Sequence, residues 1–388
     1  MTRRVLVVNA GSSSLKLRML EPDNRLAAAI DLPAPRGRVS DAGIAAALRP
    51  LAPAGAVGHR IVHGGTEFTG AVPVNDAVIR RLEALSDLAP LHQPISLAIL
   101  AAVTRALPDV PAVACFDTAF HAGMPAAAAT YALPAEWRER WSLRRYGFHG
   151  LSHAYAACRA ASLMGDQGRQ RVVTCHLGAG ASLGAVMNGR SVDTTMGFTP
   201  LEGLVMATRS GSVDPGLVLW LEQHAGMTAA ELADVLEHRS GLLGLAGSSD
   251  MKEIVSRAES GDRTARLGLD VYVHRLRAGV AAMAAAMDGV DALVFTGGVG
   301  ENSPPIRQRT AEGLGFLGVG LDPDLNSGPG GDREISRAGS AVRTFVVSAR
   351  EDLEIARQVR ESMAWDTAPE SPAPLRTGAG LRARRTAS

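Results

Sequence analysis

The segment Val5-Leu-Val-Val-Asn9, followed by Gly11-Ser-Ser-Ser14, decides the fold class. A short apolar run that ends at a polar turn is typical of a buried strand, and residues 15–20 alternate as a returning strand does. The same pattern recurs at Val172-Val-Thr-Cys-His176 and Gly178-Ala-Gly-Ala-Ser182, again with a strand after the turn. Two such units, about 165 residues apart, indicate two lobes of similar topology that face each other.

Helices are predicted between these strands. Apolar residues recur at helical spacing in six segments, at residues 76–86, 95–106, 153–164, 228–238, 263–287 and 352–363. Strands that alternate with helices imply an α/β fold. We expect a first lobe at residues 1–148, a second at 149–351, and a helix at 352–364 that packs back on the first lobe. Residues 366–388 contain no aromatic residue and are predicted to be a disordered tail.

Size and composition narrow the functional classes. A chain of 388 residues is too long for one comfortable core, which also favours two domains. The net charge of +1 provides no global field that would recruit nucleic acid or an anionic membrane. The longest apolar run, at residues 278–287, is too short to span a bilayer, and the apolar stretch at the start is too short for a signal peptide. We therefore expect a cytoplasmic protein without nucleic-acid or membrane partners.

Three cysteines occur, an odd number, at Cys115, Cys158 and Cys175. All three lie in apolar stretches, which favours buried reduced thiols over a disulfide or a metal site.

Glycine turns at strand ends point to phosphate binding. The two turns already named are joined by a third, Gly297-Gly-Val-Gly300, after a strand at 293–296. Backbone N–H groups that converge on phosphates require such turns. The P-loop pattern is absent because neither lysine, Lys16 or Lys252, follows a glycine. The dinucleotide pattern also fails, because Gly178–Gly184 has one residue too many and a strand follows it.

The three turns therefore suggest a different phosphate clamp, with loops from both lobes. Lys16 would act as a point charge, and Ser12 and Ser14 as hydroxyl donors. A surface lysine on an ordinary hairpin is the alternative for Lys16.

Several longer motifs occur in a fixed order: Val8-Asn-Ala-Gly-Ser-Ser-Ser-Leu-Lys16, Gly58-His-Arg-Ile-Val-His-Gly-Gly65, Leu88-Ala-Pro-Leu-His92, Phe116-Asp-Thr-Ala-Phe-His121, Tyr146-Gly-Phe-His-Gly150, Met196-Gly-Phe-Thr-Pro-Leu-Glu-Gly203 and Thr208-Arg-Ser-Gly211. In order and spacing they closely resemble the acetate kinase family of the actin-like and sugar-kinase-like phosphotransferases, from about residue 4 to 363.

This resemblance implies two lobes, each with a ribonuclease-H-like mixed sheet, an active site in the cleft between them, and a homodimer. It implies magnesium-dependent phosphoryl transfer between ATP and acetate, giving ADP and acetyl phosphate. Carried over by position, it assigns magnesium to Asn9 and Glu351, the acid's carboxylate to Arg60, and catalysis to Arg60, Asp117, His149 and Arg209. The acid's methyl group would meet Val62, Leu91, Phe148 and Pro200. The nucleotide would lie in the second lobe against His176, Leu177, Gly178, Ala179, Gly180, Asp250, Met251, Lys252, Gly298, Val299, Gly300, Glu301 and Asn302, with Lys16 near its phosphates.

The implied roles agree with the chemistry. A carboxylic acid is almost wholly ionised at pH 7, so the nucleophile needs no general base. The difficulty is charge, because an anion must approach a triphosphate, and arginines suit that task. Asp117 is then interpreted as a partner that orients Arg60 or a magnesium-bound water, and His149 as a hydrogen-bond donor to the transferring group. An apolar acid pocket distinguishes one methylene by only about 1–3 kcal/mol, so propionate is expected to be a poorer substrate.

Several positions depart from the family pattern. Ala179 replaces an asparagine, Leu151 a threonine, Gln93 an asparagine and Ser212 an aspartate, while Lys252 stands where arginine is common. Two alternatives to acetate kinase activity stay open at this point. One is a kinase for propionate or another short-chain acid, and the other is a catalytically attenuated, actin-like nucleotide-binding regulatory protein.

Overall fold

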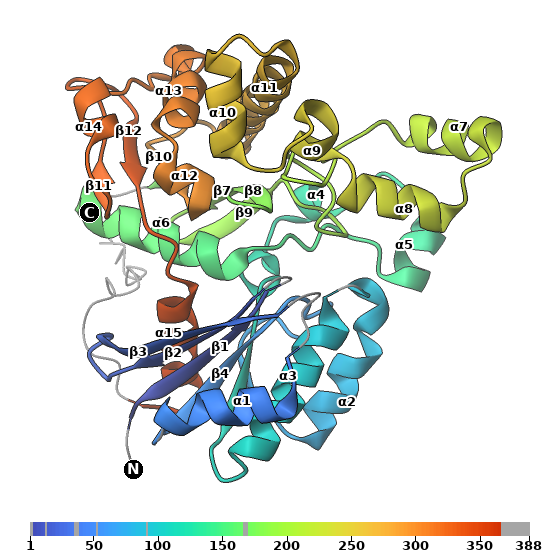
Figure 1. The fold of residues 1–388 in the computed structure, drawn as a ribbon, viewed down its shortest axis with the longest axis vertical. Helices are drawn as coiled ribbons and strands as arrows, with labels where there is room; N and C mark the ends of the chain where they lie inside the picture. The colour runs from blue at the N-terminus through green and yellow to red at the C-terminus, as the bar shows by residue number, and fades with distance from the viewer. Residues whose placement is uncertain are drawn as a thin grey trace, which may run out of the picture.

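The structure is a computed structural model that describes residues 3–11, 14–34, 39–51, 53–90, 92–165 and 170–365. Figure 1 shows two lobes, one below and one above the middle of the molecule. Of the predicted features, Ser12, Leu91 and the tail at 366–388 lie outside the described residues.

The first lobe is built on a mixed sheet of order β3-β2-β1-β4-β6-β5. β1 pairs in parallel with β4, and β4 with β6, whereas β2, β3 and β5 are antiparallel to their neighbours. The strands are β1 (Val5–Ala10), β2 (Ser14–Leu20), β3 (Leu26–Pro33), β4 (Ala56–Ile61), β5 (Val72–Pro73) and β6 (Ala112–Phe116).

The second lobe repeats this topology. Read from β9, its order is β9-β8-β7-β10-β12-β11, with the same sequence of parallel and antiparallel pairings. The strands are β7 (Arg171–Leu177), β8 (Ala181–Met187), β9 (Arg190–Thr194), β10 (Ala292–Thr296), β11 (Arg333–Glu334) and β12 (Arg343–Val346). The predicted repeat is confirmed, because β1–β2 and β7–β8 occupy equivalent places in two equivalent sheets.

Helices cover both faces of the first sheet. α1 (Asp41–Leu48) and α3 (Gln93–Ala106) bury apolar side chains on one face, and α2 (Asp76–Ala84) packs against α3. α15 (Glu351–Ser362) packs on the other face, against β1, β4 and β6. The approach of α15 is close: a Cβ on Gly58 would lie 2.5 Å from Ile355 Cγ2 and 2.7 Å from Val359 Cγ2. Glycine at residue 58 is therefore what lets α15 dock.

In the second lobe, α6 (Gly150–Met164) packs on β7 and β10, and α11 (Arg263–Ala286) covers the opposite face. α6 also contacts α15, so these two helices lie between the two sheets (Figure 1). The remaining helices are α4 (Ala126–Ala129), α5 (Ala135–Trp141), α7 (Pro215–Ala225), α8 (Ala229–His238), α9 (Gly241–Ala246), α10 (Met251–Glu259), α12 (Gly297–Asn302), α13 (Pro304–Glu312) and α14 (Pro323–Ser327).

The six predicted helices are confirmed, with ends that differ by up to three residues. The prediction of a simple turn at the third glycine segment was wrong, because Gly297–Asn302 forms the short helix α12. Three glycines lower helix propensity, so local sequence hides this helix. Tertiary contacts hold it: Arg307 Nη1 donates to the carbonyl oxygens of Gly300 and Glu301 at 2.8 and 2.9 Å.

The chain passes to the second lobe soon after β6. Residues 119–121 and α4 pack against β9, and the Tyr146 N–H donates to the Gly197 carbonyl. The division at residue 148 stays a prediction, and these contacts favour an earlier crossover.

Two further findings bear on the composition. Cys115 and Cys175 are buried free thiols, as expected, but Cys158 is exposed on α6 because it lies on the side of the helix away from the core. Within the described residues, no helix is both long enough and apolar enough to cross a membrane.

Candidate active site

Three polar residues meet at the carboxyl ends of neighbouring parallel strands in the first lobe. Asn9 lies near the end of β1, Arg60 near the end of β4, and Asp117 directly after β6. Arg60 donates to both carboxylate oxygens of Asp117, from Nε to Oδ1 at 3.2 Å and from Nη2 to Oδ2 at 2.5 Å. Its Nη1 donates to the Ala10 carbonyl at 3.1 Å. The fork of Arg60 is therefore held from two strands.

Burial and charge oppose each other in this ion pair. Asp117 is only 1% exposed, and burial raises its pKa to about 6, although the Arg60 guanidinium acts in the opposite direction. Burial also acts to lower the pKa of Arg60, but the carboxylates of Asp117 and Glu351 outweigh it, so this pKa lies above its ordinary value. The pair is ionised at pH 7, and Asp117 begins to gain a proton as the pH falls towards 6.

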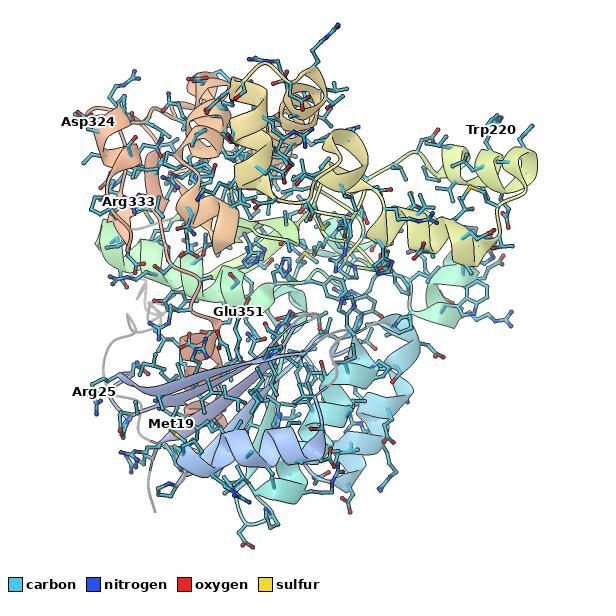
Figure 2. The ribbon with its side chains drawn as sticks, in the orientation of Figure 1. Met19, Arg25, Trp220, Asp324, Arg333 and Glu351 are labelled. Carbon is cyan, nitrogen blue, oxygen red and sulfur yellow. The ribbon has the colours of Figure 1, made fainter. Side chains whose placement is uncertain are left out.

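Asn9 and Glu351 form a second polar contact beside this pair. Asn9 Nδ2 donates to Glu351 Oε2 at 2.7 Å, and Glu351 is the first residue of α15. Figure 2 shows Glu351 between the two lobes. Lys16 is exposed and pairs directly with Asn9 across β1 and β2, so their side chains share one face of the sheet.

This donor set fits magnesium. An amide oxygen and a carboxylate are hard oxygen ligands, and Mg²⁺ is usually bound by one or two carboxylates together with substrate phosphates and water. Within the described residues, no group of three or more His, Cys, Asp or Glu side chains could hold a metal ion without such help. Asn9 and Glu351 would therefore need the phosphate oxygens of a bound nucleotide to complete a magnesium site.

Two histidines of the second lobe stack at the cleft. The rings of His149 and His176 lie 4.3 Å apart between centroids. His176 Nδ1 lies 2.8 Å from Ser152 Oγ, and His149 Nδ1 lies 2.9 Å from Ser182 Oγ. Burial lowers the pKa of both histidines; neighbouring histidines add to this effect at His149, and both Arg60 and Arg209 act on it. Both rings are therefore neutral at pH 7.

The backbone at His149 is left-handed, with φ of 57° at the N-terminal end of α6. A non-glycine residue in this region costs about 1–3 kcal/mol, and such strain gathers at functional sites.

The predicted glycine turns of the second lobe lie next to each other. A Cβ on Gly178 would lie 4.0 Å from the backbone nitrogen of Gly298, and nothing lies within 4 Å of a Cβ on Gly298 itself. Ala179, at the tip of the first turn, is exposed. Gly180 faces the reacting groups, because a Cβ there would lie 3.2 Å from His149 Nε2 and 3.7 Å from Arg209 Nη1.

Arg209 forms no salt bridge with a carboxylate of the described chain. Its Nη1 donates to the Pro200 carbonyl at 3.3 Å, and its Nη2 lies 3.5 Å from His92 Nε2, a residue of the first lobe. Burial lowers the pKa of Arg209, but a guanidinium stays charged at pH 7. The site thus contains a half-buried cation without an anionic partner.

The predicted acid pocket is partly assembled. Val62 and Phe148 are 6% and 2% exposed and belong to one hydrophobic cluster, and Pro200 is half-buried. The loop that carries Pro200 is fixed from outside: Glu202 accepts from Tyr131 Oη at 2.6 Å and from Arg145 Nη2 at 2.7 Å.

Other predicted nucleotide residues have mainly structural contacts. Asp250 accepts from the Lys252 N–H and caps α10, while Met251 and Leu177 are buried in the core. Glu301 accepts from the backbone N–H groups of Gly297 and Ala349. Asn302 Nδ2 donates to the Gly298 carbonyl, Val299 is half-buried and Gly300 is buried. Ser14 is half-buried, and its carbonyl accepts from the Gly11 N–H.

Three of the residues that depart from the family pattern make contacts that account for them. Gln93 exchanges two hydrogen bonds with the backbone of His63, and Ser212 Oγ accepts from the Gly203 N–H at 3.0 Å. Leu151 is buried in the cluster that contains Ile355. No comparable contact explains Ala179.

Sequence reasoning missed four residues around the site: His92, His153, Ser182 and Arg307. His153, which received no role from the sequence, lies 2.8 Å from the serine that holds His149. The spacing of four between His149 and His153, just before and at the start of the predicted helix at 153–164, was the available signal. His92 and Ser182 stood in quoted segments without a role, whereas the sequence around Arg307 gives no such indication.

Comparisons with known proteins agree with this arrangement. A sequence model of the Acetokinase family matches residues 44–357. The chain is 44% identical to the acetate kinase of Fervidobacterium nodosum, over 92% of this chain and 97% of that protein. It is 50% identical to the acetate kinase of Gloeobacter violaceus over 78% and 75% of the two chains.

Solved structures give the same result. The crystal structure of Porphyromonas gingivalis acetate kinase superposes with a TM-score of 0.85 at 36% identity, covering 93% of this chain and 99% of that one. A propionate kinase from Francisella tularensis superposes with a TM-score of 0.84 at 34% identity, covering 92% and 99%. The family match over most of the chain, together with these identities, shows that this chain belongs to the Acetokinase family.

Proposed function

We propose that this protein is an acetate kinase, which transfers the γ-phosphoryl group of ATP to acetate reversibly. One observation carries the proposal: His149 Nε2 and Arg209 Nη1 of the second lobe both lie beside Gly180, and Arg209 Nη2 lies 3.5 Å from His92 Nε2 of the first lobe. The Arg209 cation therefore lies where the two lobes meet, and the charges of Arg60 and Arg209 add to the burial that lowers the pKa of His149. The names of the relatives support acetate as the acid.

The residues suit each part of the transfer. A carboxylate oxygen of acetate would form a bond to the γ-phosphorus as the bond from that phosphorus to the bridging oxygen of ADP breaks, and no proton passes between acetate and ATP. Arg60 would bind the acetate carboxylate and Arg209 the phosphoryl oxygens, because guanidinium groups fork onto both. Asp117 keeps Arg60 in place and takes no part as a base.

Asn9 and Glu351 would hold magnesium through their side-chain oxygens. The ion would supply charge neutralisation at the phosphates. The chain's own contribution is to hold the two ligands together, through the hydrogen bond between β1 and α15.

The nucleotide is proposed to lie against two adjacent glycine segments of the second lobe, the turn at residues 178–180 and the start of α12. Gly298 leaves open space where a side chain would stand, which lets a phosphate approach the backbone. His176, at the end of β7, lies next to these turns, and Lys16 faces the same region from the first lobe through its pairing with Asn9.

The predicted pocket is apolar, because Val62 and Phe148 are 6% and 2% exposed and belong to one hydrophobic cluster. We expect such a pocket to favour acetate over a longer acid. The Francisella tularensis relative is a propionate kinase of the same fold, so the preference is a matter of degree. The experiment is a hydroxamate assay with ATP and Mg²⁺ on acetate, propionate and butyrate in parallel. Highest turnover on acetate, lost in Arg60→Ala, supports the proposal. Acyl phosphate formed best from propionate would reassign the substrate, and nucleotide binding without acyl phosphate would favour the regulatory alternative.

We also propose a homodimer. No residue of α7 is buried, and Leu217, Leu219 and Trp220 on it are each about half exposed, at 48%, 55% and 53%. Figure 2 shows Trp220 at the outer end of the molecule, away from the cleft. Exposed apolar residues gathered on one projecting helix are typical of a protein interface.

A further inference from the structure

His149 is the first member of a chain of hydrogen bonds that runs into the second sheet. Its Nδ1 lies 2.9 Å from Ser182 Oγ, which in turn lies 2.8 Å from His153 Nε2. His153 Nδ1 lies 2.8 Å from Thr174 Oγ1, and this hydroxyl lies 3.2 Å from the Gly184 carbonyl oxygen. Ser182, His153 and Thr174 are each 0% exposed. Solvent therefore has no access to these three inner side chains.

The far end of the chain sets its direction. A carbonyl oxygen only accepts, so the Thr174 hydroxyl donates to Gly184 and its oxygen accepts from His153 Nδ1–H. A neutral His153 then has a lone pair at Nε2, which accepts from the Ser182 hydroxyl. The Ser182 oxygen is left to accept from His149 Nδ1–H.

We propose that this chain, which we call the histidine relay (His149, Ser182, His153 and Thr174), fixes His149 as the Nδ1–H tautomer. Ser182, His153 and Thr174 are accordingly positioning residues of the phosphoryl-transfer site. This inference deepens the proposed function and rests on it for its catalytic meaning, but the tautomer itself is a property of the free protein.

The opposite direction makes one bond fewer. If Thr174 donated to His153, then His153 would donate to Ser182 and Ser182 to His149, which uses three bonds. The Thr174 and Gly184 oxygens would then face each other at 3.2 Å as two acceptors without a hydrogen between them. Two lone-pair-bearing oxygens at this separation repel each other when neither supplies a hydrogen. The four-bond direction is therefore the stable one in this buried strand pair.

The relay determines what His149 offers to the cleft. Its Nε2 faces Gly180, on the same side as Arg209 Nη1. In the neutral Nδ1–H ring, Nε2 carries a lone pair and cannot donate to a phosphoryl oxygen. It donates only after taking a proton from solvent, when Nδ1–H stays on Ser182 and Nε2–H meets the phosphoryl group. His149 thus stabilises transfer as a cation, formed when the negative phosphate arrives, and not as a neutral donor.

The test is ¹⁵N NMR of the imidazole nitrogens in the unliganded protein, where the two neutral tautomers give different patterns. His149 is identified by the signal lost in His149→Gln. We expect Nδ1–H for both His149 and His153. In Thr174→Val, which keeps the shape but removes the hydroxyl, His153 loses its acceptor and both rings switch to Nε2–H. Thr174→Ser, the matched control, keeps Nδ1–H. Native Nε2–H at His149, or an unchanged His149 signal in Thr174→Val, would overturn the proposal.

Kinetics separate a positioning role from a merely structural one. We expect Thr174→Val to lower kcat by about tenfold, as one lost hydrogen bond to a charged group does, with the KM values for ATP and acetate unchanged. Ser182→Ala gives an independent check: His153 keeps Nδ1–H while His149 becomes a mixture of tautomers. Because the spectra need no substrate, they decide the tautomer even if acetyl phosphate formation fails, and the hydroxamate assay decides that question separately.

Discussion

Asn9 and Glu351 are joined by a 2.7 Å hydrogen bond although 342 residues separate them in the chain. This bond connects β1, the first strand, to α15, the last described helix. The proposed magnesium site therefore requires that both β1 and α15 are in place on the first lobe. We expect metal affinity to depend on the docking of α15, because a displacement of α15 would move one of the two proposed ligands.

The charge of Glu351 is the first target. Glu351→Gln keeps an oxygen that accepts from Asn9 but removes the negative charge. We expect the Mg²⁺ concentration for half-maximal rate to rise by about 10- to 100-fold, the equivalent of 1.5–3 kcal/mol, with the KM for acetate little changed. A magnesium titration at fixed ATP measures this. Asp352→Asn is the control, since this neighbouring carboxylate pairs with Arg350. Equal shifts in both variants would show that only general charge matters.

The raised pKa of Asp117 leads us to expect a loss of activity in mild acid. Burial raises its pKa to about 6, so below pH 6 the carboxylate gains a proton and releases Arg60. We expect kcat/KM to fall towards tenfold per pH unit below this value. The unfolded pKa is 3.8, lower than the folded one, so the folded state binds this proton more tightly. Protonation of Asp117 between pH 6 and 4 therefore favours the folded state, and activity is lost before the fold.

Initial rates of ADP formation from pH 8 to 5, with circular dichroism at each pH, test this prediction. Recovery of the rate on return to pH 7 is the control for irreversible change. A rate that stays constant down to pH 5 would mean that the Arg60 guanidinium keeps Asp117 ionised and that burial has little effect on it.

The absence of a side chain at Gly58 allows α15 to approach β4 closely. In Gly58→Ala the new methyl group meets Ile355 and Val359, so the helix has to move. We expect the free energy of unfolding to fall by about 1–3 kcal/mol, and the magnesium requirement to rise with it because Glu351 shifts. Urea unfolding measures the first effect. Gly70→Ala, where nothing lies within 4 Å of the new methyl group, should change neither quantity. Val359→Ala in the Gly58→Ala background should restore part of the stability.

The sequence predicted the strand ends of the site but not how its parts are held together. The apolar runs before Asn9 and His176 end at glycine turns, and this local pattern is enough to place both residues at strand ends. Glu351 was assigned only by resemblance, because no local pattern relates it to Asn9. Ser182 looks like any serine in a strand, and its role depends on two histidines from a helix that packs over it. The helix at Gly297–Asn302 was missed because its glycines lower helix propensity, and the donation from Arg307 to two of its carbonyl oxygens comes from a later segment.

Trp220 tests the proposed dimer. Trp220→Asp places a charge at an exposed apolar position of α7, a helix with no buried residue. We expect the mass measured by light scattering after gel filtration to change from two chains to one. Phe316→Asp is the control, since Phe316 is 75% exposed but lies far from α7 in the sequence and in another part of the second lobe. A native protein that is already monomeric would overturn the dimer proposal, and a dimer retained in Trp220→Asp would move the interface elsewhere.

Arg307 is expected to control nucleotide affinity from a distance. Its side chain is 0% exposed, and it donates to the Gly300 and Glu301 carbonyls and to both the side chain and the backbone of Asn326. Burial lowers its pKa to about 10, so it stays charged at pH 7 with only neutral partners. Lysine has three donors in place of the guanidinium fork and cannot reach both segments. We expect Arg307→Lys to raise the KM for ATP by about tenfold through a misplaced α12, with the KM for acetate unchanged. Arg309→Lys, on the same helix but paired with Asp270 near the surface, should leave both values unchanged. An Arg307→Lys protein that loses stability but binds ATP normally would show that α12 keeps its position without this arginine.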